Sequence, residues 1–236
     1  MIADDPAAPE SSNVRPLRPV RSFVLRQGRT SPAQQRALDA LLPAFGIPLA
    51  EAPLDFQATF GRRAPVVLEI GFGMGETTAA IAKAQPDRDF IGIEVHGPGV
   101  GSLLNRIESE VLTNVRVVRG DAMDIVGSMI GAGSLAGLHA FFPDPWPKKR
   151  HHKRRLMKSP FVHELALCLA SGGYLHVATD WEDYARAMLE TLSTEPLIEN
   201  QSEDFSPRPA WRPETKFEKR GVALGHAVFD LVFRRR

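Results

Sequence analysis

The sequence predicts an α/β fold, in which a mostly parallel sheet carries helices on both faces and ends in an antiparallel strand. Three observations predict it. Short apolar runs rich in β-branched residues alternate with stretches that have apolar residues at helical spacing, which is typical of βαβ units. A glycine-rich turn, GFGMGE, joins the first apolar run to a helical stretch. The last run, HAVFDLVFRR (226–235), alternates apolar and polar residues with no helix after it, as an added antiparallel strand would.

The chain begins with a segment that shows no periodicity. Residues 1–20 are rich in proline, alanine, serine and acids, and we expect them to form a disordered tail. Residues 21–236 are expected to form a single domain whose first part, 21–60, is an N-terminal extension. Within it, the hydroxyl of Ser31 followed by Pro32 predicts a helix start, and the stretch AQQRALDALLPAF supplies apolar residues at helical spacing.

The remaining elements alternate along the chain. The apolar runs predict strands at 65–70, 89–94, 114–120, 137–142, 173–179 and 226–235. The helical spacing predicts helices near 76–85, 98–112, 122–130, 156–171 and 181–193. In such a sheet, ligands bind beyond the carboxyl ends of the strands, near the point where the strand order reverses. The residues just past each predicted strand are therefore the candidates for function.

Composition and charge limit the class of protein. The chain has 236 residues, 43% of them hydrophobic, and its net charge of +1 does not by itself indicate nucleic-acid binding. No apolar run approaches the roughly 20 residues of a membrane helix, and the start MIADDPAAPE lacks the basic and apolar segments of an export signal. The single cysteine, Cys168, lies in an apolar helical run, which predicts a buried thiol in a reducing compartment. We expect a cytoplasmic protein and, since no exposed apolar helix face stands out, a monomer.

A glycine loop follows the first predicted strand. In LEIGFGMGETT, Glu69 precedes Gly71, Gly73 and Gly75. Alternate glycines let the backbone approach a ligand closely, although a tight strand-to-helix turn without a ligand would use the same residues. A dinucleotide site would have the spacing G-x-G-x-x-G. Here the spacing is G-x-G-x-G after an acid that would repel a pyrophosphate. This disfavours an NAD-dependent oxidoreductase and favours S-adenosylmethionine, which is cationic and carries an amino-acid group.

Two further acids follow strand ends. Glu94 closes the second predicted strand, where it could accept hydrogen bonds from ribose hydroxyls. Asp121 follows the third, where it would lie near an adenine. Each acid taken singly could instead be a helix N-cap. Together with Glu69, they place carboxylates at three successive strand ends, which favours a cofactor site.

The fourth predicted strand leads into FFPDPWPKKRHHKRR (141–155). Three prolines around Asp144 and Trp146 restrict the backbone and lower the entropy cost of one loop shape. A rigid acid beside an aromatic plate would suit a flat, hydrogen-bonding substrate such as a purine. The run that follows comprises Lys148, Lys149, Arg150, His151, His152, Lys153, Arg154 and Arg155. A solvated helix face is the plain alternative, but six cations without an intervening acid repel one another and favour contacts with phosphates.

These motifs resemble the bacterial tRNA (guanine-N7-)-methyltransferase family. The matching segments are RSFVLRQGR, VLEIGFGMGETT, IGIEVHGPGVGSLL, FFPDPWPKKRHHKRR, ATDWEDYA and RPETKFEKRG, which span nearly the whole chain after residue 20. The resemblance implies a Rossmann-like class I methyltransferase fold with a seven-stranded sheet and no metal. It also implies S-adenosylmethionine as methyl donor and tRNA as partner. The acceptor would be N7 of the guanine at position 46 in the variable loop, which becomes 7-methylguanosine.

The resemblance assigns Asp144 to catalysis. With the glycines of the loop, the cofactor-binding residues are then Glu69, Gly71, Gly73, Gly75, Glu94, Asp121 and Asp144. The substrate-binding residues are Lys148, Asp180, Thr215, Lys216, Phe217 and Glu218. The RNA-binding residues are Arg150, His151, His152, Lys153, Arg154 and Arg155. Guanine N7 already has an in-plane lone pair, so Asp144 need not act as a base; we expect it to accept hydrogen bonds from the guanine or to orient the donor.

Three questions stay open at this level. Asp180 could accept a second guanine hydrogen bond or cap the helix that follows it. The segment RPAWRPETKFEKRG could be a mobile loop that closes on RNA or an ordinary long connection. Two rival functions also remain. A methyltransferase for a small molecule or a protein would leave the cations without a role, and a non-catalytic RNA-binding protein would not explain the acids at the strand ends.

Overall fold

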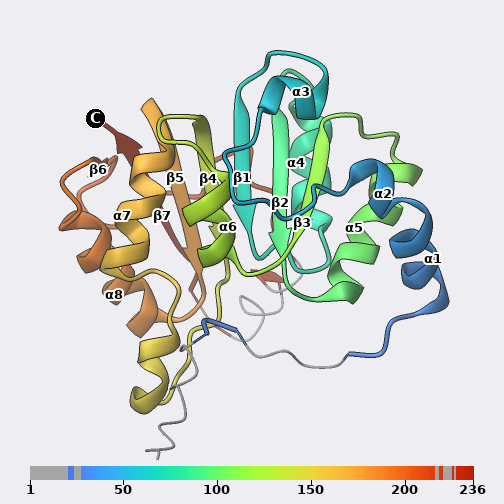
Figure 1. Ribbon diagram of the computed structural model, residues 1–236. Coiled ribbons are helices and arrows are strands. Elements are labelled where there is room, and N and C mark those ends of the chain that lie inside the picture. Colours follow the sequence, from blue (N-terminus) through green and yellow to red (C-terminus); the bar gives the residue numbers. More distant parts are fainter. Residues whose placement is uncertain (1–20, 24–27, 216–217, 220–224, 226) are drawn as a thin grey trace, which may run out of the picture.

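The computed structural model describes residues 21–23, 28–215, 218–219, 225 and 227–236. The predicted tail 1–20 and the predicted substrate contacts Lys216 and Phe217 lie outside the described residues. Within them, seven strands form one sheet in the order β3-β2-β1-β4-β5-β7-β6 (Figure 1). The strands are β1 Val66–Ile70, β2 Asp89–Glu94, β3 Val115–Arg119, β4 Leu135–Phe141, β5 Leu169–Thr179, β6 Ile198–Asn200 and β7 Phe229–Arg235. The predicted fold class is confirmed: β1 to β5 pair in parallel, and β7 is antiparallel to β5 and β6.

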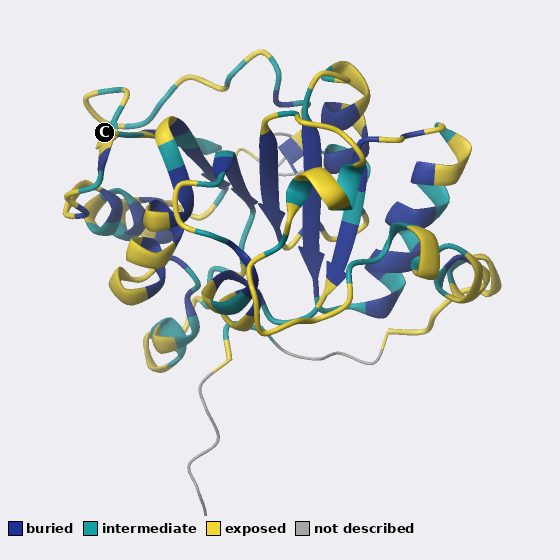
Figure 2. Cartoon of the chain, turned by 45° about the horizontal axis from the view of Figure 1, so that its top comes forward, coloured by how far each residue is buried: buried dark blue, intermediate teal, exposed yellow. Residues whose placement is uncertain are grey.

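Helices cover both faces of the sheet (Figure 1). They are α1 Pro32–Ala40, α2 Leu42–Phe45, α3 Phe56–Phe60, α4 Glu76–Ala84, α5 Gly97–Ser109, α6 Ala122–Met129, α7 Ser159–Cys168 and α8 Glu182–Ser193, with a 3₁₀ helix η1 at Lys149–Arg154. Side chains on a strand alternate between the two faces. Val66, Leu68 and Ile70 of β1 accordingly pack with α6, α7 and α8, while Val67 packs with α1, α4 and α5. Figure 2 shows the central strands buried between these two layers.

The N-terminal extension passes around the β3 edge of the sheet. The α1 helix starts as predicted, with Ser31 as N-cap in a capping box and proline in the first turn. After α2, Gly46 forms a parallel bridge with Val117 of β3, and the Ile47 N–H donates to the Val117 carbonyl over 2.8 Å. The extension therefore covers an edge that would otherwise present unpaired backbone groups.

The structure departs from the predicted elements in the C-terminal half. The predicted helix 156–171 is shorter, because α7 begins at Ser159 and the apolar residues from Leu169 onward belong to β5. An apolar run alone does not distinguish a buried helix end from a buried strand. The strand β6 was not predicted, since its three residues are too few to show a period. Cys168 is buried and unpaired, as predicted. None of the described helices is long and apolar enough to cross a membrane.

Candidate active site

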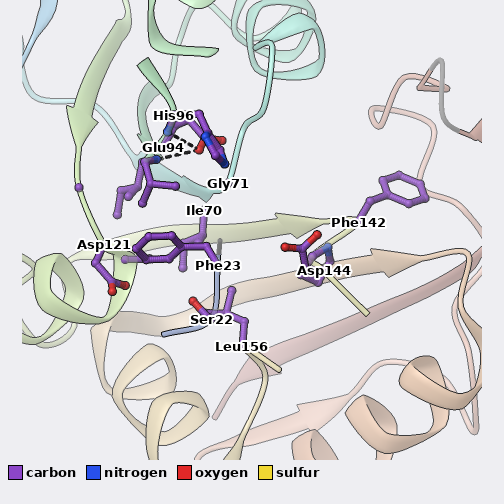
Figure 3. A pocket seen from close by; sticks show the side chains of 15 residues that line it. Ser22, Phe23, Ile70, Gly71, Glu94, His96, Asp121, Phe142, Asp144 and Leu156 are labelled. Carbon is purple, nitrogen blue, oxygen red and sulfur yellow. Dashed lines mark hydrogen bonds between the residues drawn. The ribbon is translucent and has the colours of Figure 1, made fainter. Parts of the chain in front are cut away.

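A cavity of about 220 Å³ lies at the carboxyl edge of the sheet, between β1 and β4 (Figure 3). The chain runs from β1 through β2 to β3 on one side and from β4 to β5 on the other, so this is the point where the strand order reverses. Ligands of open α/β sheets bind there. The cavity is lined by Ser22, Phe23, Ile70, Gly71, Ile93, Glu94, Val95, His96, Gly120, Asp121, Ala122, Phe142, Pro143, Asp144 and Leu156. Four of the predicted cofactor residues are thus brought together.

The glycine loop has the backbone that a close ligand contact needs. Gly71, Gly73 and Gly75 all have positive φ, between 57° and 73°, a region that other residues rarely adopt. A Cβ on Gly71 or Gly73 would meet no atom within 4 Å, so open space lies in front of the loop. A Cβ on Gly75 would lie 2.6 Å from the Cβ of Leu103, so this glycine allows α4 and α5 to pack closely. The open space at Gly71 and Gly73 fits close contact with a ligand, whereas the close packing at Gly75 fits the alternative of a tight strand-to-helix turn.

Glu94 joins the glycine loop to the start of α5. Its carboxylate accepts the Gly73 N–H at 2.9 Å, the Val95 N–H at 2.7 Å and the His96 N–H at 3.0 Å. These bonds fix one wall of the cavity in Figure 3. The N-cap of α5 is His96, so Glu94 is not a helix cap. Carboxylate oxygens have about four acceptor sites in total, so Glu94 retains capacity for a ribose hydroxyl.

Asp121 follows β3, the strand next to β2 in the sheet. It is the N-cap of α6, and its Oδ1 accepts the Met123 N–H at 3.1 Å. The alternative that it is a cap is therefore confirmed, but the residue also lines the cavity. Burial raises the pKa of Asp121 above its ordinary value, and the Met123 N–H opposes that shift. Figure 3 shows Phe23 between Asp121 and Asp144 in the view drawn.

Asp144 stands exposed in a loop of unusual backbone shape. Phe142 and Trp146, each two residues away from it, have φ of 52° and 46°. A non-glycine residue in this left-handed region costs about 1 kcal/mol or more. The surroundings must therefore impose the shape. The side chain of Arg155 supplies one such restraint, since its Nε donates to the Pro145 carbonyl at 2.9 Å.

Glu69 lies beneath the cavity and is not part of its lining. It is 3% exposed within β1, and Thr78 of α4 is nearby. Burial raises the pKa of Glu69 to about 7, and the Thr78 hydroxyl opposes this shift. Among the described residues, however, neither Glu69 Oε2 nor Thr78 Oγ1 has a hydrogen-bond partner of good geometry. A buried polar atom of this kind usually has a partner. An unpartnered carboxylate oxygen here fits a cationic group of a bound donor.

Replacing Glu69 with glutamine is expected to stabilise the protein above neutral pH. Because the native pKa is about 7 and the ordinary value is 4.5, the native state binds more protons than the unfolded chain between these values. Stability therefore falls as the pH rises from about 4.5 through about 7. The uncharged amide removes this loss, which is about 3 kcal/mol at pH 8. Thermal unfolding between about pH 5 and pH 8.5 should give a flatter stability profile for Glu69→Gln. The exposed Glu164→Gln is the matched control, and identical profiles for Glu69→Gln and wild type would contradict the prediction.

The cation run does not present all its side chains to solvent. Lys148, Lys149, Arg150 and Lys153 are exposed. Arg155 is 7% exposed; its guanidinium is bound by Asp183 of α8 and lies 4.7 Å from the ring centroid of Tyr184. Arg155 ties the Asp144 loop to α8, and its contact with RNA stays a prediction.

Trp146 also differs from the expected base-stacking plate. Its indole Nε1 donates to the Ser22 carbonyl at 3.1 Å, which holds the start of the described chain over the cavity. The guanidinium of Arg154 lies 5.0 Å from the ring centroid, and His151 approaches edge-on at 5.9 Å. Partial burial, followed by the charges of neighbouring cations, lowers the pKa of His151. His151 is therefore mainly neutral at pH 7.

Of the predicted substrate residues, the four that the structure describes lie at the same edge of the sheet without lining the cavity. Lys148 precedes η1, and its side chain is exposed. Asp180 follows β5 directly, and it does not cap α8, whose N-cap is Trp181. Thr215 and Glu218 are joined by a hydrogen bond in which the Glu218 N–H donates to Thr215 Oγ1 at 3.0 Å. Glu218 is only 5% exposed, so its carboxylate faces the protein interior.

Several cavity residues were not predicted. They are Ser22, Phe23, Ile70, Ile93, Val95, His96, Gly120, Ala122, Phe142, Pro143 and Leu156. Most are apolar side chains that carry no chemical signal of their own. Val95 and His96 follow β2, and Phe142 follows β4, so the rule on carboxyl ends could have identified these three.

Comparison with known proteins identifies the family. A family model described as "Putative methyltransferase" matches residues 63–231. The tRNA (guanine-N(7)-)-methyltransferase of Aromatoleum aromaticum is 60% identical over 235 residues, which cover 100% of this chain and 89% of that protein. The chain belongs to the tRNA (guanine-N(7)-)-methyltransferase family. The enzyme of the same name from Methylobacillus flagellatus is 57% identical over 93% of this chain and 92% of its own.

Membership of the tRNA (guanine-N(7)-)-methyltransferase family confirms two predictions made from the motifs, the methyltransferase class and S-adenosylmethionine as donor. Solved structures agree on the fold. The 16S rRNA methyltransferase KamB superposes with a TM-score of 0.57 at 15% identity, over 76% of this chain and 92% of that one. The antibiotic-resistance methyltransferase Kmr gives 0.55 at 16% identity, over 80% and 94%. At these identities the likeness concerns the fold alone.

Proposed function

We propose that this enzyme transfers a methyl group from S-adenosylmethionine to N7 of the variable-loop guanine of tRNA, with Asp144 at the reacting centre. The observation that carries the proposal is the segment between β4 and α7. It places Asp144 in the cavity and four exposed cations within the next nine residues, at the same edge of the sheet. A base bound at Asp144 would then have its flanking phosphates near η1. The name shared by the relatives supports the acceptor and the atom.

The donor would be held by the groups that the cavity presents. Backbone around Gly71 and Gly73 is open to a ligand, Glu94 can accept from ribose hydroxyls, and the second carboxylate oxygen of Asp121 can accept from an amino group on adenine. Glu69 would compensate a positive charge from below. When bound, S-adenosylmethionine supplies a methyl group on a positively charged sulfur.

Asp144 acts on the acceptor through charge and position. Guanine N7 needs no proton removed before it attacks, so the enzyme must mainly place N7 in line with the methyl group and exclude water. As the methyl group moves, positive charge passes to the purine ring. A carboxylate that accepts the guanine N–H groups stabilises this charge, because those donors become more acidic as the ring becomes cationic. The strained loop holds the carboxylate in place before the substrate arrives.

Exposed cations on η1 would bind tRNA phosphates, which contribute affinity without sequence information. A guanine in a folded tRNA core is stacked, so binding must also expose its N7 edge. Cytoplasmic location and a monomeric state fit such an enzyme and stay predictions.

Transfer of labelled methyl from S-adenosylmethionine to unmodified tRNA tests the proposal, with nucleoside digestion to locate the label. We expect the label in 7-methylguanosine and its loss when the variable-loop guanine is replaced by adenine. Binding of the donor without any transfer to tRNA would contradict the proposal and favour a small-molecule or protein acceptor.

A further inference from the structure

A buried ion-pair network lies under the last loop, outside the cavity. Arg212 is 1% exposed, and its guanidinium binds two carboxylates. Its Nε and Nη2 donate to the two oxygens of Asp230 at 2.8 and 2.9 Å. Its Nη1 and Nη2 donate to the two oxygens of Glu218 at 2.7 and 2.9 Å. Such two-pronged pairs fix orientation as well as contributing energy.

This network leaves Glu218 directed toward the protein. Both of its oxygens are bound by Arg212, and one also accepts the Thr215 N–H at 3.3 Å. In return, Thr215 Oγ1 accepts the Glu218 N–H. The carboxylate that the family resemblance assigns to substrate therefore binds an arginine and the Thr215 N–H.

The other end of the network is fixed to the sheet. Asp230 lies on β7, 3% exposed, and its carboxylate also binds Nε2 of His176 on β5 at 2.6 Å. Trp211, the residue before Arg212, stacks on the ring of His139 of β4, with centroids 4.9 Å apart. The loop is therefore held by three neighbouring strands. Within the segment RPAWRPETKFEKRG, Trp211 and Arg212 are thus anchored to the sheet.

Arg212 also lies close to the Asp144 loop. Its guanidinium is 5.9 Å from the ring centroid of Phe141 and 6.0 Å from that of Phe142. Phe142 lines the cavity two residues before Asp144. The Arg212 side chain thus connects Glu218 to the strand end that carries the catalytic loop.

We propose that Arg212 and Glu218 are positioning residues, which hold Thr215 at the edge of the acceptor site, and that Glu218 acts on tRNA only through Arg212. This inference rests on the proposed function. It differs from a direct contact between Glu218 and the guanine, because in that case Glu218 would contribute whether or not Arg212 were present.

A double-mutant cycle separates these two roles. Glu218→Gln, Arg212→Met and the double variant are compared by steady-state kinetics with tRNA and by donor affinity. We expect each single variant to raise KM for tRNA by about tenfold or more, the double variant to be no worse than Arg212→Met, and donor affinity to stay within about twofold. Arg212→Lys, which keeps the charge without the two-pronged geometry, should recover part of the loss.

The exposed Glu214→Gln in the same loop is the matched control, since it removes a carboxylate that pairs only loosely with Lys219, at 3.8 Å. It should behave as wild type. Two results would overturn the inference. One is a rise in KM for the double variant that equals the product of the rises for Glu218→Gln and Arg212→Met. The other is a kcat at saturating tRNA that falls in Glu218→Gln and in no other variant. Donor affinity reports folding of each variant, because neither residue lines the cavity. If the wild-type enzyme does not methylate tRNA, that result contradicts the proposed function and is thereby distinguished from a failure of this inference.

Discussion

Replacing Asp144 with alanine is expected to lower kcat for methyl transfer to tRNA by about 10² to 10³-fold, the usual cost of removing one preorganised charged group from a reacting centre. Donor affinity should fall by less than about tenfold, because Gly71, Glu94 and Asp121 also line the cavity and keep their own contacts. Removing the carboxylate leaves the cationic purine product without its compensating charge. Single-turnover transfer at saturating donor and tRNA measures the first effect, and calorimetric titration with the donor measures the second.

Asp144→Asn refines the same test. The amide has the same shape, so it keeps the loop and changes only the charge and the hydrogen-bonding pattern. If charge is the main contribution, Asp144→Asn should lose nearly as much kcat as Asp144→Ala. Glu182→Gln is the matched control, since Glu182 is an exposed acid at the same edge of the sheet that pairs with Arg186 and does not line the cavity. Normal turnover by Asp144→Ala, or a loss of donor binding with unchanged kcat, would remove Asp144 from the reacting centre.

The main residues of the site could be predicted from the sequence because the patterns that indicate them are local. Strand runs, glycine spacing and an acid between prolines are each read within a few residues, and the rule that ligands bind at carboxyl ends brings them together. Gly71, Glu94, Asp121 and Asp144 lie as predicted in one cavity. The short strand β6 could not be predicted, because pairing with β7 and not its own residues makes it a strand.

The roles of charged residues were less accessible from the sequence. Arg155 ends a run of similar cations, and its tertiary contacts with Asp183 and Tyr184 separate it from them. Glu218 and Arg212 are six residues apart in a segment without periodicity, so nothing local indicates that both are buried. Burial of a charge depends on a partner, here Asp230 on a distant strand. Sequence patterns locate candidate acids and bases, whereas tertiary contacts decide whether they face substrate or protein.

Reversing the exposed cations of η1 is expected to weaken tRNA binding without affecting the donor site. The triple variant carries Lys149→Glu, Arg150→Glu and Lys153→Glu. All three wild-type side chains are exposed, and none of them forms an ion pair among the described residues. If each contacts a phosphate, affinity for tRNA should fall by about 10- to 100-fold, and the slope of log affinity against log salt should become shallower by about 2 to 3. Titration of tRNA at several salt concentrations measures both quantities. Arg155 is left unchanged, because its loss would release the Asp144 loop and confuse the two effects.

A control of equal charge distinguishes local phosphate contacts from the overall field of the protein. The control triple variant carries Arg63→Glu, Lys83→Glu and Arg234→Glu. These three exposed cations lie toward the amino edge of the parallel strands, opposite the cavity. Both triple variants change the net charge from +1 to −5. General repulsion of tRNA would weaken binding equally in the two, whereas contacts at η1 would weaken it mainly in the first. Equal losses would show that η1 contributes only to the long-range field, and the path of tRNA would then have to run elsewhere along the edge that holds Asp144.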